Sequence, residues 1–251
     1  PIKVLYLHGF EESEASPKPQ ALIKDHRFMT FVPELGVHLK KQRSPIKFAA
    51  RNPWLLGSLL IGSVVGTWLA SAHLATVPSA LIGLMVGGSL VYMLKAHIIA
   101  GAIGGSYDAS YQVAAEALKQ FEPDVVCGFS WGGALVVELV ERGMWDGPTV
   151  LLAPAHSKLA DLRGVGKVSA FPKLPLNAVV VHSSADQLIP IDYSRELCRA
   201  QPEAKKVRLI EISKDPHKMW SIASDGTLAR LVFEAGMAKS QSNTIIHDCD
   251  D

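Results

Sequence analysis

Cysteine is scarce in this chain of 251 residues. The three cysteines, Cys127, Cys198 and Cys249, are far apart, form no Cys-x-x-Cys pair and have no Cys/His spacing typical of a zinc site. An odd number of widely spaced cysteines builds no disulfide scaffold, and a chain of this length can bury a core without one. We therefore expect a reducing compartment, with neither a metal nor another cofactor.

Charge is also low, and neither sign dominates. Charged residues make up 20% of the chain, and 25 Lys and Arg against 24 Asp and Glu leave a net charge of +1. A protein that binds nucleic acid through its phosphates needs a clear excess of positive charge. The composition therefore argues against a nucleic-acid partner.

Charged side chains are missing altogether between Arg51 and Lys95. This stretch is long enough to cross a bilayer twice, at about 20 residues per crossing. We expect a helical hairpin with crossings at residues 54–74 and 79–100. Two helices or strands buried in a globular core would give the same apolar pattern. Because core segments seldom exceed about 20 residues without a charge, we favour membrane insertion.

The residues around this predicted hairpin suggest its orientation and its partners. Basic residues flank it on both sides and none lies in its turn, which places both flanks on the cytoplasmic or matrix-like organellar side. Glycines spaced by four suit close packing of helices, so we expect membrane lipid and other transmembrane subunits as partners. These glycines are Gly62, Gly66, Gly83 and Gly87. His73 and His97 could ligate a haem or chlorin metal, although anchoring at the interface suits single histidines better.

The rest of the chain alternates strand-like and helix-like segments. Buried strands are predicted at residues 3–8, 124–129, 149–153, 178–182 and 207–212, a further strand at 29–32, and helices at 111–121, 132–142 and 192–200. Such alternation predicts an α/β fold with a mostly parallel sheet flanked by helices. We expect residues 1–50 and 105–238 to form this domain, 51–104 the inserted hairpin, and 239–251 a loosely ordered tail.

A glycine-rich turn carries the first sign of chemistry. Gly128-Phe129-Ser130-Trp131-Gly132 lies between a predicted strand and a predicted apolar helix, the setting in which Gly-x-Ser-x-Gly presents a nucleophilic serine. Glycine on each side of the serine relieves crowding in the tight turn. The helix behind it aims amides and a positive dipole end at any oxyanion formed there. The alternative interpretation is that Ser130 is only a small residue that fits a tight turn.

An acid and a base follow at the ends of later strands. Asp186 comes after the run at 178–182, and His217 after the run at 207–212. Carboxyl ends of parallel strands share one edge of a sheet, so we expect both side chains near Ser130. Helix capping by Asp186 and an exposed loop position for His217 are the alternatives. Asp192 is the next acid candidate.

The remaining histidines are weaker candidates for the base. His156 and His182 do not lie in a loop after the acid, and His8 is better explained as a structural hydrogen-bonding group in its turn. Cys127 lies in a predicted buried strand and is interpreted as a small core residue.

The order serine, acid, histidine resembles that of the α/β-hydrolases. The opening Leu5-Tyr6-Leu7-His8-Gly9-Phe10, with Ser16-Pro17-Lys18 soon after, is similar to the start of small bacterial esterases, and residues 125–134 and 148–155 resemble the dienelactone-hydrolase-like branch. The resemblance implies Ser130 as nucleophile, His217 as general base, Asp186 as its acid partner, and the backbone amides of Phe10 and Trp131 as the oxyanion hole. The inserted hairpin departs from the family pattern.

Two functions stay open at this point. The first is a membrane-anchored serine hydrolase that cleaves lipophilic or small acyl esters through an acyl-enzyme. The second is a catalytically idle accessory subunit of a larger membrane complex, docked by its hairpin. The intact Ser-Asp-His set favours the first, and the glycine spacing keeps the second open.

Overall fold

A six-stranded parallel sheet underlies the part of the chain that the structure describes. The computed structural model describes residues 1–37, 57, 64, 79–165, 177–199, 207–213 and 215–247. The six strands of this part are β1 (Ile2–Leu7), β2 (Phe28–Phe31), β3 (Val125–Phe129), β4 (Thr149–Leu152), β5 (Ala178–Ser183) and β6 (Arg208–Ile212). They are ordered β2-β1-β3-β4-β5-β6, and every neighbouring pair is parallel. The prediction of a mostly parallel α/β sheet is therefore confirmed.

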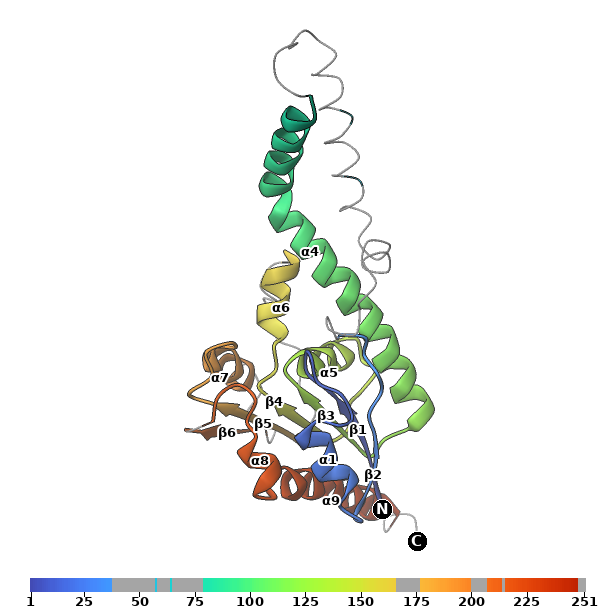
Figure 1. Ribbon diagram of the computed structural model, residues 1–251. Helices are drawn as coiled ribbons and strands as arrows, with labels where there is room; N and C mark the ends of the chain where they lie inside the picture. Colours follow the sequence, from blue (N-terminus) through green and yellow to red (C-terminus); the bar gives the residue numbers. More distant parts are fainter. Residues whose placement is uncertain are drawn as a thin grey trace. The chain divides into compact units, whose positions relative to one another are not determined.

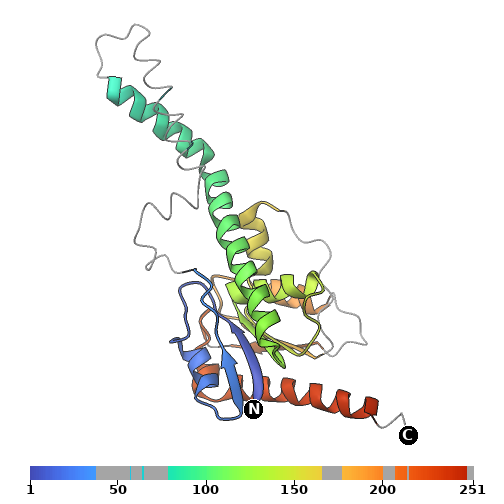
Figure 2. The same ribbon diagram turned by 90° about the vertical axis from the view of Figure 1, so that its right-hand side faces the viewer.

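Helices cover both faces of this sheet. They are α1 (Pro17–Ile23), α4 (Ser79–Phe121), α5 (Trp131–Glu141), α6 (His156–Arg163), α7 (Ile191–Arg199), α8 (Ser221–Ser224) and α9 (Thr227–His247). Figures 1 and 2 show α1, α8 and α9 on one face, and α5 and α7 on the other. Since every strand points the same way, the loops after β1, β3, β5 and β6 all emerge at one edge.

Alternation along the strands divides the core into two layers. Tyr6 and Cys127 are paired neighbours and pack with Leu231 and Val232 of α9 in one buried cluster. The intervening strand residues point to the opposite face, where the backbone of Gly128 lies against Val136 of α5. Burial on both faces explains why β3, β4 and β5 are composed mainly of apolar residues.

Two segments differ from the sequence-based expectation. β6 was expected to be fully buried, but it is an edge strand whose residues are half-buried or exposed. An edge strand has a partner on one side alone, which allows polar residues such as Arg208 and Glu211. Helix α9 continues to His247, past Lys239, where the sequence predicts a loosely ordered tail.

The prediction of a multi-pass membrane protein is contradicted. Among the helices of the described residues, none is long and apolar enough to cross a membrane. The second predicted crossing does not end at residue 100, because α4 runs on to Phe121 and buries Ala114, Ala117 and Leu118.

Several residues of the predicted hairpin lie outside the described residues. These are the first crossing at 54–74 apart from residues 57 and 64, with Gly62, Gly66 and His73. Gly83, Gly87 and His97 lie in α4. The chain divides into two compact units, of which unit 1 comprises Pro1–His38, Ala109–Asp161 and Val165–Asp251, and unit 2 comprises Leu39–Asp108 and Leu162–Gly164. The whole sheet belongs to unit 1.

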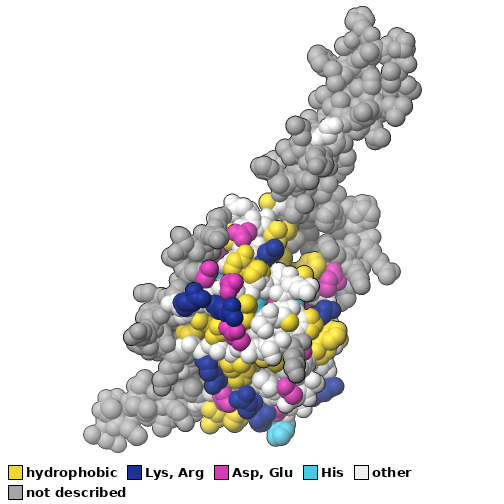
Figure 3. All heavy atoms as spheres, turned by 90° about the vertical axis from the view of Figure 1, so that its left-hand side faces the viewer, with side chains coloured by type: hydrophobic (Ala, Val, Ile, Leu, Met, Phe, Trp, Pro, Cys, Tyr) yellow, Lys and Arg dark blue, Asp and Glu magenta, His cyan; other side chains and the backbone are white. Residues whose placement is uncertain are grey.

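Charge on one face of the protein is mixed rather than gathered by sign. On the face drawn in Figure 3, basic and acidic side chains lie interspersed. Several of them form ion pairs at exposed positions, among them Arg195 with Glu211 at 2.8 Å and Arg208 with Glu234 at 3.1 Å. This distribution agrees with the near-zero net charge of the chain.

Candidate active site

Ser130 lies in a strained turn between β3 and α5. Its φ of 51° and ψ of −109° fall outside the regions that a residue with a side chain normally adopts. Such a conformation costs on the order of 1–3 kcal/mol and persists where the surroundings hold it in place. Three backbone hydrogen bonds do so: Ser130 donates to the Leu152 carbonyl at 2.9 Å, and its carbonyl accepts from Ala134 and Ala155 at 3.0 Å each.

The glycines of this turn allow close packing of backbone on backbone. A Cβ on Gly132 would lie 2.0 Å from the Leu7 carbonyl oxygen, and one on Gly128 would lie 2.7 Å from the Gly132 oxygen. The sequence explains both glycines by crowding around the serine. The structure shows a further reason for Gly132, which is that α5 begins directly against the end of β1.

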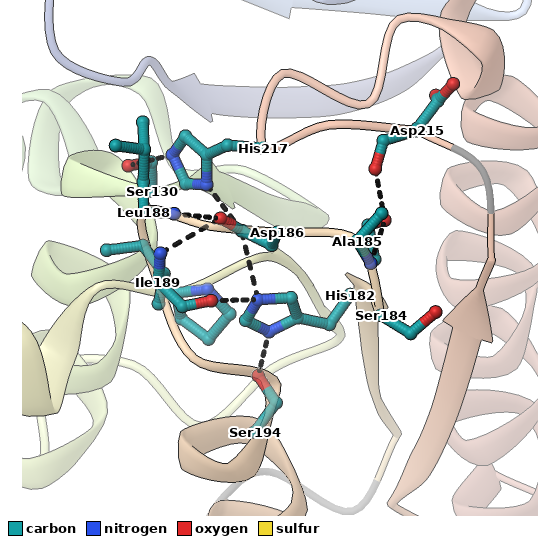
Figure 4. A network of polar contacts seen from close by, with 12 residues as sticks. Ser130, His182, Ser184, Ala185, Asp186, Leu188, Ile189, Ser194, Asp215 and His217 are labelled. Carbon is teal, nitrogen blue, oxygen red and sulfur yellow. Dashed lines mark hydrogen bonds and ion pairs between the residues drawn. The ribbon is translucent and has the colours of Figure 1, made fainter.

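The structure brings the three predicted side chains together at the carboxyl edge of the sheet (Figure 4). His217 Nε2 lies 2.9 Å from Ser130 Oγ, and His217 Nδ1 lies 2.6 Å from Asp186 Oδ2. With the proton on Nδ1, the imidazole donates to the carboxylate and accepts from the serine hydroxyl. Ser130 is 8% exposed as a residue, and the side chain of His217 is 11% exposed, so neither is completely buried.

Asp186 is held by more hydrogen bonds than the sequence suggests. Its Oδ1 accepts from the amides of Leu188 at 2.8 Å and Ile189 at 2.9 Å, while its Oδ2 accepts from His217 and also from His182 Nε2 at 3.1 Å. Burial opposes the charge of this carboxylate, but the hydrogen bonds from both histidines and Ile189 outweigh it and hold the pKa of Asp186 well below its usual value. The carboxylate is therefore ionised at neutral pH.

His182 forms a second serine–histidine–aspartate chain on the same carboxylate. Its Nε2 lies 3.1 Å from both Asp186 Oδ2 and the Ile189 carbonyl, and its Nδ1 lies 2.7 Å from Ser194 Oγ. Both His182 and Ser194 are completely buried, whereas Ser130 and His217 are not. Ser130 is therefore the more accessible of the two serines that contact a histidine on Asp186.

Comparison with solved structures supports the fold but no particular activity. The chain matches a protein of the α/β hydrolase superfamily from Xanthomonas campestris pv. campestris with a TM-score of 0.50 and 15% identity, over 96% of this chain and 99% of that one. It matches Est1E from Butyrivibrio proteoclasticus with a TM-score of 0.52 and 12% identity, over 97% of this chain and 88% of that one. It matches the α/β hydrolase domain-containing protein 10 from mouse with a TM-score of 0.52 and 11% identity, over 91% of this chain and 87% of that one.

The chain has the α/β-hydrolase fold. No family model and no curated protein matches its sequence.

The residues predicted for the oxyanion hole of this hydrolase fold lie side by side. Phe10 follows the turn after β1, Trp131 is the first residue of α5, and the centroids of their rings are 6.1 Å apart. The amide of Trp131 belongs to the first turn of a helix, where amides point outward from the positive dipole end. In the described part of the chain, no hydrogen bond engages the Phe10 amide.

The other candidate residues have different surroundings. His8 is buried, with Nδ1 2.9 Å from the Gly9 carbonyl and Nε2 3.3 Å from the Leu35 amide, as expected of a structural group. Asp192 pairs with Arg195 at the surface. Cys127 is buried in β3, where burial raises the pKa of its thiol. Burial also lowers the pKa of His156 to about 4, so that this ring is neutral.

The roles of two residues near the site, His182 and Lys18, were not predicted from the sequence. His182 was set aside because it precedes the acid, although a histidine at a strand end four residues before an aspartate could have been examined as its partner. Lys18 was noted only within a family-like segment, yet it is fully buried with its Nζ 2.8 Å from Glu12 Oε1. No sequence signal marks it, because lysine near a helix start is normally exposed.

Proposed function

We propose that the protein is a serine hydrolase that cleaves acyl esters through a covalent acyl-enzyme at Ser130. The observation that carries this proposal is the continuous hydrogen-bonded chain from Ser130 Oγ through His217 to Asp186, with distances of 2.9 and 2.6 Å. A nucleophile, a base in contact with it and a group that orients the base are the parts that covalent acyl transfer requires.

The reaction follows from the positions of these atoms. Ser130 Oγ attacks the ester carbonyl carbon while His217 Nε2 takes the hydroxyl proton. The imidazolium so formed keeps its Nδ1 hydrogen bond to Asp186, which stabilises the positive charge. When the tetrahedral intermediate collapses, the bond to the alcohol breaks and Nε2 returns the proton to the leaving oxygen. Water then attacks the acyl-enzyme by the same route, releasing the acid and regenerating Ser130.

The charge on the tetrahedral oxygen needs donors that are already in place. The amides of Phe10 and Trp131 are the groups we assign to it, one after β1 and the other at the start of α5. Each such donor contributes about 3–4 kcal/mol to transition-state stabilisation in comparable sites. The fixed position of α5 against β1 keeps the second donor at a constant distance from the nucleophile.

Apolar side chains beside the triad support small or lipophilic acyl esters as substrates. Phe10 is 45% exposed, Leu188 64% and Trp220 53%. Leu188 follows Asp186 by two residues and Trp220 follows His217 by three, so each belongs to a loop that carries a member of the triad. Exposed apolar surface at a reactive centre favours apolar acyl or alcohol groups over charged ones.

A fluorophosphonate probe tests this proposal directly. Such a probe phosphonylates an activated serine, so the native protein should be labelled and Ser130→Ala should not. Ser194→Ala is the matched control, because Ser194 also contacts a histidine on Asp186 but is buried; labelling should persist in it. Failure of the folded native protein to react, or labelling that persists in Ser130→Ala, would leave the hydrolase proposal without support and favour an idle scaffold.

A further inference from the structure

A buried lysine links three segments beneath the triad. Lys18 lies near the start of α1 and is 0% exposed. Its Nζ donates to Glu12 Oε1 and to the Lys218 carbonyl, both at 2.8 Å, and lies 3.7 Å from the centroid of the Phe129 ring. A buried ammonium group is costly unless it is paired and hydrogen-bonded, so these contacts account for its position.

Two of these contacts lead straight to the reacting residues. Lys218 is the neighbour of His217, and Phe129 is the neighbour of Ser130. The Phe129 ring also packs against the His217 ring, with centroids 5.1 Å apart. Phe129 has little freedom to move, because a Cβ on Gly9 would lie only 2.6 Å from its ring. One ammonium group thus contacts both the histidine loop and the nucleophile turn.

The histidine loop needs such an anchor. Met219, which follows Lys218, is fully buried and has a φ of 43°. A non-glycine residue in this region is strained and keeps its conformation only where contacts hold it. Two hydrogen bonds are among these contacts. The Met219 amide donates to the Pro216 carbonyl at 2.9 Å, and Lys18 Nζ donates to the carbonyl of the preceding residue, Lys218.

We propose that Lys18 is a positioning residue, which holds the loop of His217 so that Nε2 stays within hydrogen-bonding distance of Ser130 Oγ. This inference rests on the hydrolase function proposed above. Lys18 acts through the Lys218 carbonyl and the Phe129 ring and does not touch the substrate. Glu12 has a separate part, since it supplies the counter-charge that allows an ammonium group to be buried.

Because Lys18 and Glu12 have separate roles, a matched pair of variants can distinguish them. Replacing Lys18 alone would leave the Glu12 carboxylate buried without a counter-charge, which is strongly destabilising. Glu12→Gln with Lys18→Met removes both charges and both anchoring contacts. Glu12→Gln alone is the control, because the Lys18 amino group still donates to the Lys218 carbonyl whether or not it carries a charge. Both variants are compared with the native chain at equal concentrations of folded protein.

The measurements are kcat and KM for an apolar ester, the rate of fluorophosphonate labelling, and amide hydrogen exchange in residues 215–220. In the double variant we expect kcat and labelling rate to fall about 10- to 100-fold with KM changed less than about twofold, the effect of a misplaced base. Exchange in 215–220 should rise. The Glu12→Gln control should keep kcat within about threefold of native. Equal kcat in the double variant and the control, with lowered thermal stability alone, would overturn the proposal.

Two further outcomes can be distinguished from a failure of the Lys18 proposal. If the double variant does not fold, Glu12→Gln with Lys18→Gln keeps a polar side chain in the site but is too short to reach the Lys218 carbonyl, and the same losses are expected. If the native protein shows neither turnover nor labelling, the hydrolase function fails. Hydrogen exchange then still tests the anchor, because unchanged exchange in 215–220 would contradict it.

Discussion

Replacing Gly132 by alanine should disable the site by moving α5 away from β1. The added Cβ would lie 2.0 Å from the Leu7 carbonyl oxygen and 2.4 Å from the Leu7 carbonyl carbon, against the 3.4 Å at which ordinary contact begins. The helix must therefore retreat by roughly 1.4 Å, and both neighbours are backbone atoms that no rotamer change can move. Ser130, two residues before Gly132, would move with the helix.

The expected effect follows from this displacement. Ser130 Oγ now lies 2.9 Å from His217 Nε2, and a shift of this size breaks the hydrogen bond. A misplacement of about 1 Å costs on the order of 10²-fold in rate, so kcat should fall at least that far. Overpacking should also lower the free energy of unfolding by about 1–3 kcal/mol.

Gly104→Ala provides the control for this experiment. Gly104 lies in α4, and no described residue lies within 4 Å of its would-be Cβ, so alanine should stabilise the helix by up to about 1 kcal/mol and leave kcat unchanged. Ester turnover and denaturant unfolding are measured for both variants. Native turnover and native stability in Gly132→Ala would refute the close contact between α5 and β1 on which the site depends.

Two other predictions concern protons. Asp186→Asn should lower kcat about 10⁴-fold, because an amide cannot hold His217 in the tautomer that accepts from Ser130; a loss under tenfold in single-turnover kinetics would argue against this role. Burial lowers the pKa of His156 to about 4, whereas the same histidine in the unfolded chain has a pKa of about 6.5. As the pH falls from about 6.5 to 4, the unfolded chain therefore binds a proton that the folded protein does not. The free energy of unfolding should fall by about 3 kcal/mol over this range. His156→Gln should remove that dependence in denaturant titrations while the exposed His26→Gln should retain it, and equal slopes in the two would count against a buried neutral His156.

The sequence predicts the parts of the site that depend on local patterns. The turn around Ser130 is recognisable because its two glycines, the strand before it and the helix after it are contiguous. Asp186 and His217 are placed near Ser130 because parallel strands end at one edge. These inferences need only the order of the strands along the chain, which the apolar runs supply.

Long-range packing explains what the sequence could not predict. The burial of Lys18 depends on contacts with residues 129 and 218, more than a hundred positions away. The partnership of His182 with Asp186 depends on how the loop after β5 folds back on that strand. The prediction of a membrane hairpin rested on composition alone, and apolar composition does not distinguish a membrane span from a segment packed in a globular core.

Trapping of the acyl-enzyme shows whether Ser130 forms the proposed covalent intermediate. The native protein is mixed with an activated ester, quenched in acid during the first turnover, digested and mapped by tandem mass spectrometry. We expect a single acyl group on the peptide containing Ser130, located on that serine and lost in Ser130→Ala. Hydrolysis of the ester with the acyl group on another residue, or with no acylated peptide at all, would contradict it.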